Sequence, residues 1–165
     1  MATIADVVPG SSVRHGFRDP AYRAALGVEH LGADLAAPIG TPVRSPVSGR
    51  VSFAGQDDAS GEGGLGAKVQ ADDGASVGVW HLSRVDVAAG QRVAPGQQLG
   101  LAGQSGGAVY PHTHLQVEQP PGTPVDPLGY LAGLGGGGIG GPIVGGSIVG
   151  GAVVALLVAA ALLED

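Results

Sequence analysis

The central part of the chain, from residue 28 to about residue 131, consists of short apolar runs that glycine and proline interrupt. In "GTPVRSPVSGRVSFAG", residues 40–55, apolar or small residues alternate with polar ones, and this period of two is typical of a half-buried strand. In "AKVQADDGASVGVWHLS", residues 67–83, two such runs flank Asp73 and Gly74, a dipeptide that favours a hairpin. The pattern therefore predicts an all-β domain of mainly antiparallel strands.

The N-terminal segment, residues 1–27, shows no comparable period. Turn-forming pieces such as "VPGSS" and "FRDP" predict an irregular segment, with one short helical turn at "AYRAAL", residues 21–26. It has no basic stretch followed by an apolar run, so we do not expect a secretory signal peptide here.

The C-terminal part has a different composition. Residues 132–142 form a Gly-rich linker, and residues 143–165 form an apolar segment in which 21 residues, 143–163, carry no charge. A helix of that length could span a membrane, but its first half is rich in glycine and no basic residue flanks it. Two interpretations stay open with equal weight: a helix that inserts into a membrane, or a tail that packs inside an oligomer or larger assembly.

Composition narrows the classes of function. The 32 glycines and 12 prolines disfavour long helices. A net charge of −6 without any basic run argues against nucleic-acid binding through a basic patch. Cysteine is absent, so any bound metal must be held by histidine, aspartate or glutamate.

The stretch "PHTHLQVE", residues 111–118, places two histidines one residue apart. On a strand, alternate side chains share a face, so His112 and His114 become neighbours that point into a groove. Gln116 and Glu118 lie on the same face and are weak candidates for hydrogen bonds to metal-binding imidazoles. The opposite face would pack on the core with its three members: Thr113, Leu115 and Val117.

A second stretch, "HLGAD", holds His30 and Asp34, and the nearby Gly32 and Pro38 argue against a regular helix. In an extended segment, residues four apart share a face. An imidazole and a carboxylate suit zinc, Zn2+, and together with His114 they make three protein ligands. A fourth position would stay open for water, which is the arrangement of catalytic rather than structural zinc sites.

The third stretch, "VWHLS", places His81 at the end of a strand-like run beside Trp80. A lone histidine in such a place is more often a packed residue than a catalyst. Four of the five histidines, however, fall in these three stretches, which favours a shared chemical role. The fifth, His15, is expected to be a surface loop residue, with occlusion or lining of the groove as the alternative.

The three stretches together resemble the signature of the lysostaphin/LytM-type zinc metallopeptidases, which cut peptide bonds in bacterial peptidoglycan. That family has H-x-x-x-D, then a strand that ends in Y-x-H-L, then H-x-H, and this chain has "HLGAD", "VWHLS" and "HTH" in that order. Three further segments are similar to the family's sequence between and after these motifs: "DLAAPIGTPVRSPVSGRVSFAG", "VDVAAGQRVAPGQQLGLAGQSG" and "GTPVDPLGYL". The resemblance covers residues 28–131.

The resemblance implies that His30, Asp34 and His114 bind zinc, and that His81 and His112 are the catalytic pair beside the metal. Which of these two is the general base stays open. The chain departs from the family at Val79 of "VWHLS", at Gln116, in the polar stretch "DDASGEGGLG", and in "SGGAVYPHTH", a longer lead-in to H-x-H than is usual. None of these departures removes a ligand.

The expected function is a zinc-dependent endopeptidase of peptidoglycan. A wall hydrolase without an export signal suggests a phage virion, with the enzyme at the tail tip, other tail proteins as partners and the host membrane as a possible target of the apolar tail. The alternative is a structural plug or membrane-penetrating tail component whose peptidase-like domain binds the wall without catalysis. A third, weaker interpretation is a lysin that is made in the cytoplasm and released at lysis.

Overall fold

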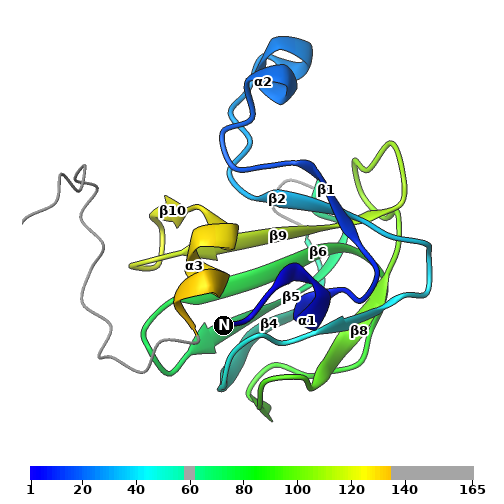
Figure 1. Ribbon diagram of the computed structural model, residues 1–165. Coiled ribbons are helices and arrows are strands. Elements are labelled where there is room, and N and C mark those ends of the chain that lie inside the picture. The colour runs from blue at the N-terminus through cyan, green and yellow to red at the C-terminus, as the bar shows by residue number, and fades with distance from the viewer. Residues whose placement is uncertain (58–61, 135–165) are drawn as a thin grey trace, which may run out of the picture.

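The computed structural model describes residues 1–57 and 62–134. The helices are α1 (Ile4–Val7), α2 (Pro20–Leu26) and α3 (Pro127–Gly133). The strands are β1 (Ser12–His15), β2 (Ala33–Ala36), β3 (Pro42–Arg44), β4 (Gly49–Gln56), β5 (Leu65–Ala71), β6 (Ser76–Val85), β7 (Arg92–Val93), β8 (Gln98–Ala102), β9 (His112–Glu118) and β10 (Pro124–Val125). Figure 1 shows them in one sheet-rich body, with α2 standing apart from the sheet.

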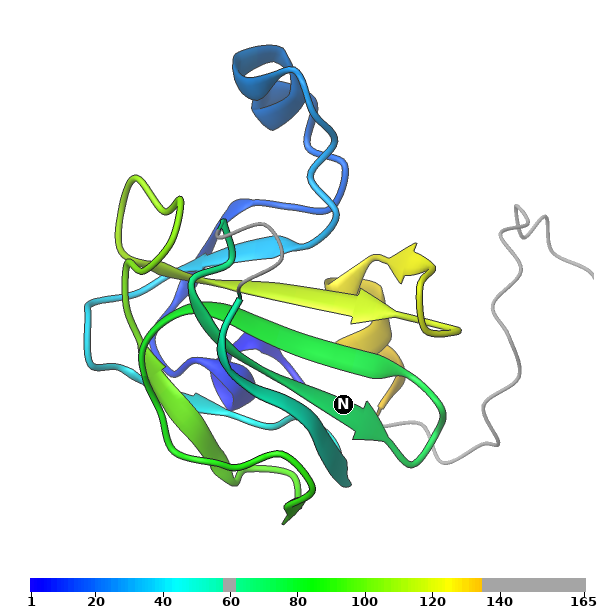
Figure 2. The ribbon, with the colours of Figure 1, turned by 180° about the vertical axis from the view of Figure 1, so that it is seen from behind.

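The strands form an antiparallel sheet in the order β1-β2-β9-β6-β5-β4-β7. Strand β10 pairs with β9, and β8 joins β3 to the second half of β6. The view from behind shows the long strands β5, β6 and β9 side by side (Figure 2). The predicted all-β antiparallel fold is confirmed, and so is the hairpin at Asp73 and Gly74, where β5 returns as β6.

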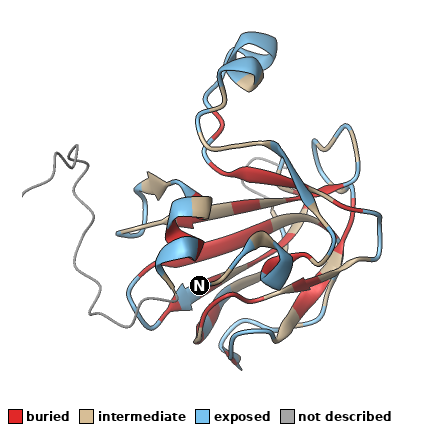
Figure 3. Ribbon diagram, in the orientation of Figure 1, coloured by how far each residue is buried: buried red, intermediate tan, exposed pale blue. Residues whose placement is uncertain are grey.

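The core lies between the sheet and the segments that cover it. In β9, Thr113, Leu115 and Val117 are buried, as the period of two predicts. Leu35 of β2 and Val79 of β6 are also fully buried in the same apolar cluster. Figure 3 shows buried residues running along β2, β9 and β6, while most of α2 is exposed.

Residues 1–27 are more ordered than the sequence predicts. The expected helical turn is α2, where Asp19 accepts a hydrogen bond from the backbone amide of Ala21 and Gly27 ends the helix with a φ of 75°. The expectation of an otherwise irregular segment was wrong, because α1 forms and β1 adds an edge strand to β2. A four-residue strand takes its stability from pairing with β2, which a local sequence pattern does not show.

Helix α3 closes the described part of the chain. It begins after Asp126, whose carboxylate accepts a hydrogen bond from the backbone amide of Leu128, and it buries Tyr130 and Leu131. The predicted helical tail at residues 143–165 lies outside the described residues. Within residues 1–57 and 62–134, no helix is both long and apolar enough to cross a bilayer.

Candidate metal centre and groove

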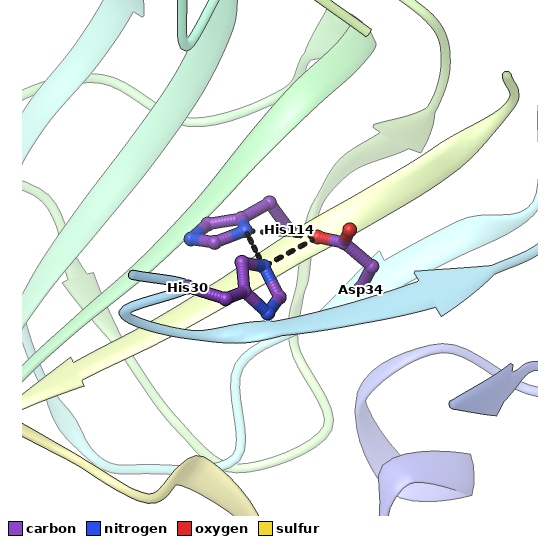
Figure 4. Close-up of side chains that lie close together, drawn as sticks. All are labelled: His30, Asp34 and His114. Carbon is purple, nitrogen blue, oxygen red and sulfur yellow. Dashed lines mark hydrogen bonds and ion pairs between the residues drawn. The ribbon is translucent and has the colours of Figure 1, made fainter. Parts of the chain in front are cut away.

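Two adjacent strands bring Asp34 and His114 together. In the pairing of β2 with β9, Asp34 lies directly opposite His114, and Ala36 lies opposite His112. His30 lies in the loop between α2 and β2. The three predicted ligands converge as Figure 4 shows: His30 Nε2 lies 3.1 Å from Asp34 Oδ1 and 3.2 Å from His114 Nδ1, and His114 Nδ1 lies 2.9 Å from Asp34 Oδ1.

Two local features allow this approach. A Cβ on Gly32 would lie 2.5 Å from His114 Nε2, so the imidazole of His114 needs a glycine at this position of the loop. The other ring nitrogen of His30, Nδ1, donates to the carbonyl oxygen of Gly16 at 2.7 Å, which fixes the orientation of the ring. The ring of Tyr22 from α2 stacks on the ring of His30, with centroids 4.3 Å apart. The N-terminal segment thus contacts a candidate ligand directly.

The three donor atoms fit a zinc ion. Zinc–nitrogen bonds of about 2.0–2.1 Å in a tetrahedral arrangement place ligand atoms roughly 3.3 Å apart, close to the three distances found here. In a neutral His30 the hydrogen is on Nδ1, so the lone pair on Nε2 faces a carboxylate oxygen. Two such acceptors in contact repel each other unless a proton or a cation lies between them. His30 and Asp34 are 2% and 3% exposed, so bulk water cannot relieve this contact.

His81 takes its place in the groove through a β-bulge. The prediction that it ends a strand was wrong: it lies inside β6, at the point where the partner of β6 changes from β9 to β8. Its φ is +63°, in the left-handed region that is uncommon for a residue with a side chain. The bulge lets Trp80 and His81 both line the groove, although successive residues of a regular strand point to opposite faces.

His81 and His112 form a second pair of imidazoles, with ring centroids 4.6 Å apart. Each donates Nδ1–H to a backbone carbonyl oxygen, His81 to Ser105 at 2.9 Å and His112 to Tyr110 at 2.8 Å. In the neutral rings, Nε2 is therefore the basic nitrogen of both residues. His112 Nε2 lies 3.5 Å from Asp34 Oδ1, at the edge of the three-residue cluster. Both imidazoles thus lie beside the candidate metal site.

Burial and charge act in opposite directions on these groups. Burial alone would raise the pKa of Asp34, but hydrogen bonds from His114 and His30 outweigh it and hold this pKa well below its usual value. Burial would lower the pKa of His30, yet its hydrogen bonds to Asp34 and Gly16 raise it. For His112, burial prevails and lowers the pKa. The lowered pKa of Asp34 keeps its carboxylate ionised, the form that binds a cation.

The pKa of His81 gives a first prediction. Burial lowers it to about 4, from an ordinary value of 6.5. Since the folded pKa lies below the unfolded one, the contribution of His81 to stability is complete above pH 6.5 and is lost as the pH falls towards 4. An NMR titration of the imidazole signals of the metal-free protein, with His81→Gln to assign them, is expected to place the His81 transition near pH 4. A transition at pH 6.5 or above would contradict the burial of this ring.

A groove of about 820 Å³ is lined by Asp34, His81, His112 and His114. Its lining includes His15, so the expected surface loop residue instead lies on β1 and faces the groove, the alternative considered above. The His15 ring packs edge-on against His30, but His15 is not a member of the three-residue cluster. Gln116 and Glu118, the expected hydrogen-bond partners of the ligand imidazoles, bond elsewhere: Gln116 donates to Glu118 at 2.9 Å, and Glu118 pairs with Lys68.

Tyr110, Tyr22 and Arg14 line the groove and were missed by sequence reasoning. Tyr110 could have been noticed, because it lies in the unusually long lead-in to H-x-H and is only two residues from His112. Arg14 and Tyr22 carry no comparable signal. They belong to the segment before residue 28, which the resemblance does not cover.

Known proteins resemble this chain in sequence and in fold. Glycyl-glycine endopeptidase ALE-1 from Staphylococcus capitis is 33% identical over 114 residues, which are 67% of this chain and 31% of the relative. The catalytic domain of lysostaphin from Staphylococcus simulans matches with a TM-score of 0.59 at 32% identity, covering 65% of this chain and 82% of that structure. A zinc-containing peptidase from Vibrio cholerae matches with a TM-score of 0.66 at 29% identity, and the match covers 76% of this chain and 38% of the peptidase chain.

This chain thus spans about a third of the length of the endopeptidase from S. capitis. Its antiparallel sheet is of the lysostaphin/LytM type. The profile of Peptidase family M23 matches residues 28–127, well over half of the chain, and the chain therefore belongs to this family.

Proposed function

We propose that this protein is a zinc-dependent endopeptidase that cleaves peptide cross-links of bacterial peptidoglycan. The observation that carries the proposal is the convergence of His30, Asp34 and His114 within hydrogen-bonding distance of one another, beside two further imidazoles in one groove. Family membership supports it, and the relative from S. capitis is named as a glycyl-glycine endopeptidase.

The chain's own residues divide into two groups. His30, Asp34 and His114 would hold zinc, which when bound lowers the pKa of a coordinated water to about 7 and polarises a carbonyl group. His81 and His112, with Nε2 free of the backbone bonds that hold Nδ1, would move the proton between the attacking water and the leaving amine and donate to the developing oxyanion. Two separately anchored imidazoles can divide these tasks between them.

The lining of the groove supports a peptide substrate. It contains exposed apolar side chains: Leu26 and Val28 are 60% and 57% exposed, and Val109 on the lead-in to β9 is 85% exposed. The same lining contains Asp34 and the imidazoles. A peptide bound in the groove could therefore contact apolar side chains while its backbone lies against the reacting groups.

Metal analysis combined with a zymogram tests the proposal. The enzyme is expected to bind about one zinc per chain and to clear peptidoglycan in the gel, and mass spectrometry of the released fragments identifies the bond that is cut. A protein that sediments with cell walls but holds no metal and clears nothing would instead be the wall-binding structural component considered above.

We further propose that a phage tail carries the enzyme to the host wall. The support is in the sequence: residues 143–163 carry no charge, and an apolar segment of this length needs cover from an assembly or a membrane. Proteomics of purified virions is expected to detect the chain with other tail proteins. Its absence from virions, with the protein present in the lysate, would contradict this location.

A further inference from the structure

The side chain of Tyr110 joins three elements at the candidate metal centre. Its hydroxyl donates to Asp34 Oδ2 at 3.0 Å. Its ring stacks on His112, with centroids 4.4 Å apart and planes inclined by 30°. On the ring lies the guanidinium of Arg14 from β1, 4.1 Å from the centroid. These contacts hold the hydroxyl against one atom of a ligand carboxylate.

The two oxygens of Asp34 have different partners. Oδ1 faces His30 Nε2 at 3.1 Å and His114 Nδ1 at 2.9 Å, so it is the oxygen within the cluster. Oδ2 is turned away from the cluster and accepts the hydrogen bond from Tyr110. Because the carboxylate is buried, the tyrosine hydroxyl, rather than bulk water, satisfies this second oxygen.

We infer that Tyr110 is a positioning residue that makes Asp34 a ligand through one oxygen only. The inference rests on the proposed zinc site. A carboxylate can bind a metal through one oxygen or through both, and the second oxygen would occupy a position that a catalytic zinc site keeps open. By engaging Oδ2, Tyr110 preserves that position for the reacting groups, and Arg14 keeps the tyrosine ring in place.

The long lead-in to H-x-H places Tyr110 for this positioning role. The extra residues in "SGGAVYPHTH" carry Tyr110 over the ring of His112, from where its hydroxyl reaches Asp34 across the β2–β9 pair. The same side chain therefore contacts a proposed metal ligand and a proposed acid–base residue. Its partner Arg14 comes from the N-terminal segment, which makes β1 part of the site and not only an edge strand.

The test compares Tyr110→Phe with the wild type after loading with cobalt(II), which occupies zinc sites and whose visible absorption depends on coordination number. Phenylalanine keeps the stacking on His112 and the contact with Arg14, and it removes only the hydroxyl. We expect the cobalt bands of the variant to weaken and shift as Asp34 Oδ2 joins the metal. Competition with a chelator is expected to show a zinc Kd altered by about 10–100-fold, the usual effect of losing a hydrogen bond to a ligand.

A matched control is Tyr130→Phe, which removes a hydroxyl that donates to Asp73 Oδ2 at 2.8 Å, where neither residue lines the groove. This variant should lose stability without any change in the cobalt spectrum or zinc Kd. Unchanged cobalt bands and zinc Kd in Tyr110→Phe would overturn the inference. If that variant does not fold, Arg14→Met decides, because Arg14 is exposed and its loss frees the tyrosine ring; an unchanged spectrum there would also overturn it.

The two proposals fail differently. If the wild type binds zinc and cleaves wall peptides while Tyr110→Phe behaves like it, only the role of Tyr110 is wrong. If the wild type itself binds neither zinc nor cobalt, the proposed function fails, and the positioning role fails with it.

Discussion

Replacing His114 by alanine is expected to abolish zinc binding and to lower peptidoglycan hydrolysis by on the order of 10³-fold or more. A bound metal contributes several kcal/mol of transition-state stabilisation in hydrolytic enzymes, and each 1.36 kcal/mol corresponds to a factor of ten in rate. The three candidate ligand atoms all contact one another, so removal of His114 Nδ1 leaves only His30 Nε2 and Asp34 Oδ1 to hold the metal. The measurement is zinc content together with the rate of clearing of a purified wall suspension.

The position of His114 explains why a neighbouring group cannot replace it. It lies in the middle of the sheet, opposite Asp34 on β2 and Trp80 on β6, so its backbone cannot move without breaking two strand pairs. His112 points to the same face, but its Nδ1 is engaged by the Tyr110 carbonyl and its Nε2 is 3.5 Å from Asp34 Oδ1. Two remaining ligands would hold zinc only weakly.

His15→Ala is the matched control for this prediction. It also removes an imidazole from the lining of the groove, but His15 lies outside the three-residue cluster and bonds to Asp19 at 2.9 Å. Its zinc content should equal that of the wild type. A His114→Ala variant that keeps one zinc per chain and hydrolyses walls within tenfold of the wild-type rate would show that the reaction does not depend on this cluster.

The parts of the site that lie on regular strands could be predicted from the sequence. The period of two in β9 placed His112 and His114 on one face and Leu115 on the other, because a strand leaves no other choice for adjacent side chains. The convergence of His30 and Asp34 with His114 required long-range pairing of β2 with β9. No local pattern contains that pairing, and only the combined order of the three stretches pointed to it.

The features that the sequence did not predict depend on irregular backbone or on distant partners. Because of the bulge, His81 faces the groove although the preceding residue also does. An alternating sequence pattern does not predict that one residue adopts a left-handed φ. The contact of Arg14 with Tyr110 joins positions 96 residues apart, from 14 to 110, through the edge strand β1. Strand β1 shows no clear hydrophobic period, because three of its four residues are exposed.

Alanine at His81 or at His112 is expected to lower kcat by about 10²–10⁴-fold while the zinc content stays at the wild-type level. This combination separates acid–base residues from ligands. Each imidazole is held by its Nδ1 to a backbone carbonyl, so that Nε2 is the basic nitrogen, and the two rings lie 4.6 Å apart over the groove. Both variants should bind substrate with little change in KM, because the lost interactions matter mainly in the transition state.

The pH dependence of kcat/KM then assigns the roles of the pair. A general base must be neutral to accept a proton, and burial lowers the pKa of His81 to about 4 and also lowers that of His112. The acidic limb of the wild-type profile should therefore lie below pH 6.5, and it should disappear in the variant that lacks the base while it persists in the other. His15→Ala again serves as the control for loss of a groove imidazole and should keep the wild-type limb. If both alanine variants lose zinc, or if both keep wild-type kcat, His81 and His112 are not the proton-transfer pair. The attacking water would then have to be activated without either imidazole.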